Sequence, residues 1–220
     1  MATKVFSILS LLWLTTVGAT AEHLTHLTPI PAYNADGYDQ AVFRSLIGES
    51  HPALWAILIG NIGPEFAVLL KEDDANADAT SPNQKKWFLE TAWAAEKIRL
   101  HRDTSVKRHT LEIEKPLALD LQKAFEVVLR QTRYPPEPES WSVADGGTSK
   151  FYFRPDLFGE TRNPQFGVPA GLEELARLMN DVVECLADER AALLVKCAAK
   201  AKQVLHDAAP AKKTATKRRK

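Results

Sequence analysis

Runs of apolar residues along the chain predict six short strands. The run ALWAILIG is continuous and too short for most helices, so it predicts a buried strand at 54–59. Five further runs are bounded by turn-forming residues such as Gly, Pro and Asn. They lie at 65–71, 87–92, 106–114, 150–153 and 157–161. The run at 87–92 alternates like a strand in its first half, although Phe88, Ala92 and Ala95 would also share a helix face.

A helical period begins at Pro116 and predicts a helix that stops before Pro135. The apolar residues of this helix recur every three or four positions and form one stripe. They are Leu117, Leu121, Ala124, Phe125, Val128 and Leu129. A second helix with similar spacing starts at Pro169, and helix-prone sequence rich in Ala and Lys continues to about Leu205. A shorter helix is predicted around 38–46.

The order of these elements predicts an α+β fold. We expect an antiparallel sheet of about five to six strands with two main helices on one face, plus a C-terminal helical extension. The predicted organisation has five parts. They are a signal peptide at 1–21, an irregular lead-in at 22–50, the α+β domain at 51–187, the helical extension at 188–207 and a basic disordered tail at 208–220.

The first 21 residues have the pattern of a cleavable secretory signal. Lys4 supplies a positive charge, an uncharged apolar run covers 5–18, and Ala-Thr-Ala at 19–21 offers the small residues that a signal peptidase recognises. The apolar run is shorter than the roughly 20 residues of a typical membrane span. The sequence therefore predicts a periplasmic or secreted protein whose mature chain begins near Glu22 and has no transmembrane span. An uncleaved anchor is the alternative.

Charge is balanced over the whole chain but unevenly distributed. The 220 residues contain 28 Lys and Arg and 28 Asp and Glu, yet the last ten residues hold six cations and no acid. These cations are Lys212, Lys213, Lys217, Arg218, Arg219 and Lys220. The acidic excess of the remaining chain argues against a specific nucleic-acid partner. The tail predicts binding to an anionic envelope surface, and a merely solvated tail is the alternative.

Two cysteines, Cys185 and Cys197, are separated by a stretch without Gly or Pro. If this stretch forms one helix, their Cα atoms are about 18 Å apart. A disulfide requires Cα atoms within about 7 Å of each other. The spacing therefore predicts that the two thiols do not bond to each other within one chain, unless the helix breaks near Ala187.

Metal-binding and catalytic motifs are weak or absent in the sequence. The loop that begins at Asp74 resembles a calcium loop, but it has Ala79 where the turn needs Gly and Lys85 where the metal needs Glu. His23 and His26 have the spacing of helical metal ligands, without a cysteine or clustered carboxylates nearby. No hydrolase, zinc-protease, CxxC or dinucleotide motif occurs. We therefore predict no metal site and no cofactor.

Polar and aromatic residues gather between 131 and 164 and predict a ligand surface. Arg133, Asp145, Tyr152 and Glu160 come from turns and strands that would meet at one end of the sheet. Each of them also has a structural explanation, since Asp145 opens a turn and the other side chains can pair or pack locally. Both interpretations stay open at this point.

Five short motifs carry a resemblance to a known group of proteins. They are Pro64-Glu65-Phe66, Ala95-Glu96-Lys97-Ile98, Thr132-Arg133-Tyr134-Pro135, Asp145-Gly146-Gly147 with Phe151-Tyr152-Phe153, and Gly159-Glu160-Thr161 with Asn163-Pro164. Through these motifs, residues 54–186 resemble a group of uncharacterised exported bacterial proteins. The resemblance implies export and fold rather than a defined activity. The last motif of that group has Trp where this chain has Arg162.

Two functional hypotheses follow from these observations. The first is a non-catalytic binding or inhibitory module of the cell envelope, whose partner is an envelope protein or an anionic envelope surface. The alternative is an envelope hydrolase that uses carboxylates such as Glu96, Asp145 and Glu160. Two of these carboxylates in one pocket, one of them desolvated, would favour the enzyme. Their separate use in turns and surface pairs would favour the binding module.

Overall fold

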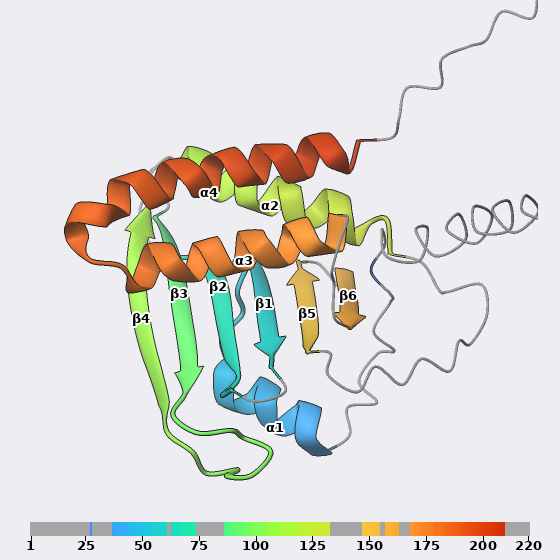
Figure 1. Ribbon diagram of the computed structural model, residues 1–220, viewed down its shortest axis with the longest axis vertical. Coiled ribbons are helices and arrows are strands. Elements are labelled where there is room, and N and C mark those ends of the chain that lie inside the picture. The colour runs from blue at the N-terminus through green and yellow to red at the C-terminus, as the bar shows by residue number, and fades with distance from the viewer. Residues whose placement is uncertain are drawn as a thin grey trace, which may run out of the picture.

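The computed structural model describes residues 27, 37–60, 63–73, 86–132, 147–154, 157–162 and 168–209. Ten helices and strands lie in these ranges (Figure 1). In chain order they are α1 (Gly37–Leu46), β1 (Leu54–Ile59), β2 (Phe66–Glu72), β3 (Trp87–Ala94), β4 (Val106–Ile113), α2 (Lys115–Leu129), β5 (Thr148–Phe153), β6 (Leu157–Arg162), α3 (Val168–Glu184) and α4 (Ala187–Asp207).

The six strands form one antiparallel sheet in the order β4-β3-β2-β1-β5-β6. The first four strands are a meander, and β5 and β6 join the free side of β1. This position makes β1 a central strand that is apolar on both faces, which explains why its sequence is continuously apolar instead of alternating. The predicted α+β class and antiparallel sheet are confirmed.

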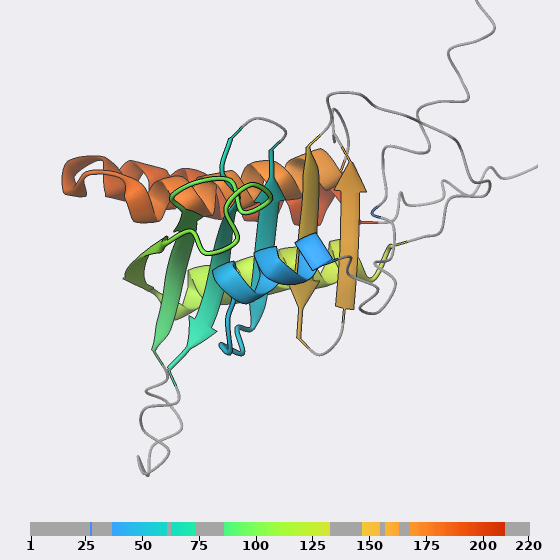
Figure 2. The ribbon, with the colours of Figure 1, turned by 90° about the horizontal axis from the view of Figure 1, so that it is seen from below.

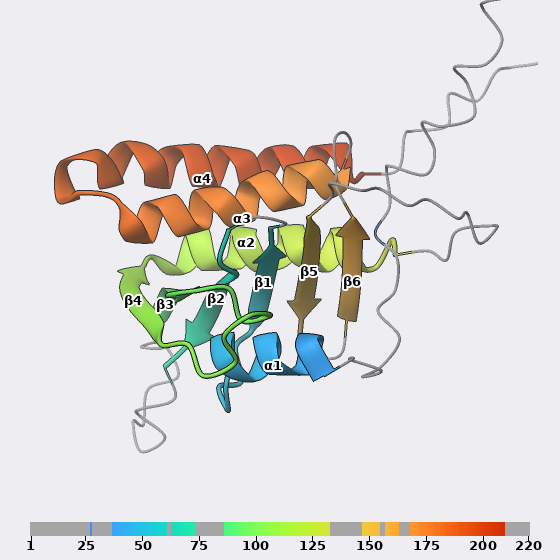
Figure 3. The same cartoon turned by 60° about the horizontal axis from the view of Figure 1, so that its bottom comes forward.

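Helices cover the sheet on both faces. Helices α2 and α3 pack on one face, and α4 packs on α2 and α3 as the outermost layer (Figure 3). Helix α1 lies across the opposite face, where it forms a second apolar cluster with alternate residues of the central strands (Figure 2). The predicted C-terminal extension is thus α4, a helix that buries Cys197, Ala201 and Val204 in the main core.

Helix α2 forms where the apolar stripe predicts it and buries that stripe against the sheet. Phe125 is fully buried, and its ring lies edge-on to Phe151 of β5 at a centroid distance of 6.1 Å. At the end of α2, Leu129 comes close to the backbone of β6. A Cβ atom at Gly159 would lie 2.9 Å from Leu129 Cδ2 and 2.8 Å from Thr132 Cγ2, so any larger residue here would force these side chains to shift.

The stretch between the two cysteines is not one helix. Helix α3 ends at Glu184, and the chain turns back so that α4 begins at Ala187. Cys185 lies half-buried at this turn and Cys197 lies in the core, and both thiols are free. The unbroken helix given as the reason against a mutual bond is wrong, and the alternative, a break near Ala187, is what the structure has. Burial raises the pKa of the Cys197 thiol from its ordinary value of 9.0 to about 12.

No helix in the described ranges combines the length and the apolar character that a membrane crossing needs. The apolar run at 5–18 and the cations of the tail lie outside the described residues.

Candidate functional site

Three aromatic side chains form a row on the face of the sheet that carries α1. Trp55 of β1 pairs with Tyr152 of β5, and Tyr152 pairs with Phe158 of β6. The rings of Trp55 and Tyr152 stack at 5.6 Å, and those of Tyr152 and Phe158 lie 4.7 Å apart. Trp55 is buried beneath Phe43 of α1, whereas Tyr152 and Phe158 are only half-buried. The outer two rings are therefore the accessible part of this row.

A charged pair lies beside the aromatic row. Lys150 and Glu160 are cross-strand partners on the same face, two residues along their strands from Tyr152 and Phe158. The Lys150 Nζ atom lies 3.7 Å from Glu160 Oε2, and the two side chains are 13% and 20% exposed. Diagonal neighbours on one face of a sheet are within reach of long side chains. We call the four residues Lys150, Tyr152, Phe158 and Glu160 the β5–β6 surface.

The structure brings together two of the four predicted ligand-surface residues. Tyr152 and Glu160 are diagonal neighbours in the β5–β6 surface. Arg133 and Asp145 lie outside the described residues. Sequence reasoning did not single out Lys150 or Phe158, although the alternation of β5 and β6 places both on the face of Tyr152. Only the pairing of β5 with β6 showed that these residues meet.

The carboxylates of the hydrolase hypothesis have separate surroundings in the described part of the chain. Glu96 lies in the connection after β3, is largely exposed, and has its Oε2 3.4 Å from His101 Nδ1 of the same connection. Glu160 lies on β6, four strand positions away from β3 in the sheet, a separation of about 19 Å. Asp145 lies outside the described residues. Glu96 and Glu160 therefore belong to different local pairs.

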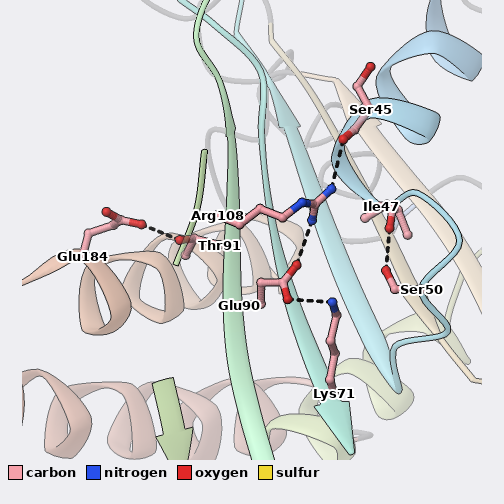
Figure 4. Close-up of polar contacts among 8 residues, drawn as sticks. All are labelled: Ser45, Ile47, Ser50, Lys71, Glu90, Thr91, Arg108 and Glu184. Atoms are coloured by element: carbon pink, nitrogen blue, oxygen red, sulfur yellow. Dashed lines mark hydrogen bonds and ion pairs between the residues drawn. The ribbon is translucent and has the colours of Figure 1, made fainter. Parts of the chain in front are cut away.

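A second charged cluster, which the sequence did not reveal, ties α1 to the sheet (Figure 4). Glu90 of β3 is only 8% exposed and accepts hydrogen bonds from Lys71 of β2 at 2.6 Å and from Arg108 of β4 at 2.7 Å. Arg108 also donates to the backbone carbonyl of Ser45 in α1 at 3.0 Å. A buried carboxylate with two charged donors is satisfied, so this cluster holds three strands and α1 together.

A fully buried carboxylate holds the other end of α1. Glu65 accepts a hydrogen bond from the Tyr38 hydroxyl of α1 and another from the backbone N–H of Ile98 at 2.8 Å. These contacts fix α1 and the connection between β3 and β4 to the start of β2. The two hydrogen bonds account for the burial of the Glu65 carboxylate and give this residue a structural role.

On the opposite face, polar strand residues position α3. Thr91 of β3 donates to Glu184 of α3 (Figure 4), and His109 of β4 lies 2.7 Å from the same carboxylate. Trp93 donates to Asn180 at 3.0 Å, and Ser149 donates to Glu173 at 2.7 Å. These side chains account for polar strand positions on the face of the sheet that carries α2 and α3.

The described residues contain no group of three or more His, Cys, Asp or Glu side chains that could hold a metal ion. The calcium-like loop from Asp74 and the pair His23 and His26 lie outside the described residues. Comparison of the chain with protein-family models, with curated proteins and with solved structures finds no match.

Proposed function

We propose that this chain is an exported, non-catalytic binding module of the cell envelope that contacts its ligand through the β5–β6 surface. The observation that carries this proposal is the half-buried pair of rings, Tyr152 and Phe158, beside the Lys150–Glu160 pair. A surface of this kind offers an apolar area together with a donor and an acceptor that fix orientation. It suits a ligand with a flat apolar face and polar groups along one edge.

The surroundings of the carboxylates support binding over hydrolysis. Glycoside-type hydrolysis by two carboxylates requires them within about 10 Å of each other. Glu96 pairs with His101, whereas Glu160 faces Lys150 on a distant strand. These separate local pairs fit a surface that recognises a ligand better than a pair that moves protons.

Export is supported by the N-terminal sequence. The positive charge, the apolar run at 5–18 and the Ala-Thr-Ala at 19–21 match a secretory signal, and the resemblance to exported bacterial proteins points the same way. The six cations of the tail add a second contact, with anionic material of the envelope, at about 1 kcal/mol for each basic residue near a charged membrane.

The test compares capture of envelope components by the mature protein and by surface variants. Tyr152→Ser combined with Glu160→Gln removes one ring and one charge from the β5–β6 surface, and Glu96→Gln is the matched control for loss of an exposed carboxylate. We expect wild type and the control to retain the same component from an envelope extract and the double variant to lose it. Circular dichroism checks that each variant is folded.

Equal capture by all three proteins would show that the β5–β6 surface does not bind the component. A hydrolytic activity that is abolished by Glu96→Gln or Glu160→Gln would instead overturn the non-catalytic assignment. These two outcomes can be told apart, because the first is measured as capture of the envelope component and the second as hydrolysis of a substrate.

A further inference from the structure

The outer face of α4 is an exposed, mostly apolar strip without a covering element among the described residues. Val195 is at its centre and is 70% exposed. Helix α4 is the outermost helix of the layer (Figure 3). By helical spacing, the other members of the strip lie on the side away from the buried Cys197, Ala201 and Val204. They are the exposed Asp188, Ala191, Ala192, Ala199 and Lys202 and the half-buried Ala198, and the exposed His206 lies on the same side one turn after Lys202.

The strip is symmetric in sequence about Val195. Ala191 and Ala199 stand four positions before and after it, and Asp188 and Lys202 stand seven positions before and after it. Seven residues are close to two helical turns, so Asp188, Val195 and Lys202 lie on nearly one line along the helix. Reversing the direction of α4 therefore superposes alanine on alanine and places an acid where a base was.

The two charges at the ends of the strip have no ion-pair partner in the described part of the chain, whereas Lys200 pairs with Glu174 of α3. Both side chains are exposed to solvent. Their charges are thus available to a partner that approaches the outer face of α4.

We propose that the outer face of α4 binds a second copy of this chain, with the two α4 helices packed antiparallel about Val195. In this arrangement Asp188 of each copy meets Lys202 of the partner, and the alanines allow the helix backbones to approach closely. A twofold axis makes the contact self-complementary, because each residue pair occurs twice. The seven-residue spacing suits the shallow crossing angle of about 20° that such helix pairs adopt.

Charge supports a second copy over an anionic membrane as the occupant. A membrane would place Asp188 against negative headgroups, whereas an antiparallel copy places it against Lys202. The last turn of one α4 would also lie near Asp188 and Glu189 of the partner, and the six cations of the tail follow that turn in the sequence. Both ends of the contact therefore join opposite charges.

The size of the contact predicts a weak, concentration-dependent dimer. The contact is confined to one helix of 21 residues, which is about 31 Å long, whereas a stable protein interface buries roughly 1,200–2,000 Å² with about 20–30 residues on each side. Association is therefore to be measured over a wide range of protein concentration.

Sedimentation equilibrium of the mature full-length protein tests the proposal through charge reversal. Asp188→Lys and Lys202→Asp each replace two attractions by two repulsions, and we expect each to weaken association about tenfold or more, corresponding to about 1.4 kcal/mol. The double variant exchanges the two charges and should restore association to within about threefold of wild type. Lys123→Glu on α2 changes charge by the same amount as Lys202→Asp, lies outside the strip, and should have little effect.

A monomeric wild-type protein at all concentrations would overturn the proposal, as would association that the two single reversals leave unchanged. Val195→Glu gives an independent check, because it should also weaken association by placing two carboxylates at the symmetry axis. Binding of the α4 face to anionic vesicles by a monomeric protein would assign the strip to a membrane instead. Capture through the β5–β6 surface does not depend on any of these results.

Discussion

Replacement of Phe125 by alanine tests the central packing contact of the fold. The side chain is fully buried between α2 and the sheet and contacts the Phe151 ring. A buried phenylalanine removes roughly 150–250 Å² from water, which corresponds to about 4–6 kcal/mol at 25 cal/mol for each Å². Because alanine keeps the Cβ atom and the site relaxes only in part, we expect Phe125→Ala to lower the free energy of unfolding by about 3–5 kcal/mol.

Urea unfolding followed by far-UV circular dichroism measures this loss directly. For a domain of this size the same loss corresponds to a decrease of about 6–20 °C in Tm. Leu119→Ala is the control, because Leu119 lies on the same helix but is 49% exposed, and it should cost less than about 1 kcal/mol. A loss below about 1 kcal/mol for Phe125→Ala would refute the packing of α2 described above.

Three further predictions concern the thiols, the tail and the N-terminus. A thiol reagent at pH 8 should modify Cys185 in the native protein but not the buried Cys197. Because burial raises the pKa of Cys197 to about 12, the free energy of unfolding should fall as the pH rises from 9 toward 12, and Cys197→Ala should reduce this fall. No fall in this pH range would contradict the burial of the Cys197 thiol. Deletion of 210–220 should leave urea unfolding unchanged and abolish binding to anionic vesicles at low salt; equal binding by both proteins would exclude the tail as the contact. The cut follows Ala209 because Ala208 is buried and its carbonyl accepts a hydrogen bond from Gln131 at 2.6 Å. N-terminal sequencing of protein from the native host should begin near Glu22, and intact Met1 in soluble cytosolic protein would disprove export.

The sequence predicted the strands and helices well where burial leaves a clear pattern. The apolar run at 54–59 matches β1 because both faces of a central strand are covered. The stripe from Leu121 to Leu129 matches the buried face of α2. The break at Cys185 and Leu186 was foreseen only as an alternative, because neither residue is a helix breaker. The chain turns there, and α4 packs back on α2 and α3.

The charged clusters could not be predicted, because they depend on which strands are neighbours. Lys71, Glu90 and Arg108 come from three strands, and their sequence separation gives no sign that they meet. Tyr152 and Glu160 were singled out as polar and aromatic residues near turns, but their shared face with Lys150 follows only from the register of β5 and β6. Local patterns identify elements, whereas long-range pairing decides which side chains form a surface.

The central position of β1 has a consequence for how the chain is made. One side of β1 pairs with β2, which follows within a few residues, but the other side waits for β5, which begins only at Thr148. Until then, a chain emerging from the ribosome or crossing a membrane presents Leu54–Ile59 as an open apolar edge, the type of edge that recruits other chains into aggregates. Fragments that end before β5 should therefore be insoluble, and a chaperone that delays folding until the last third is complete would protect this edge.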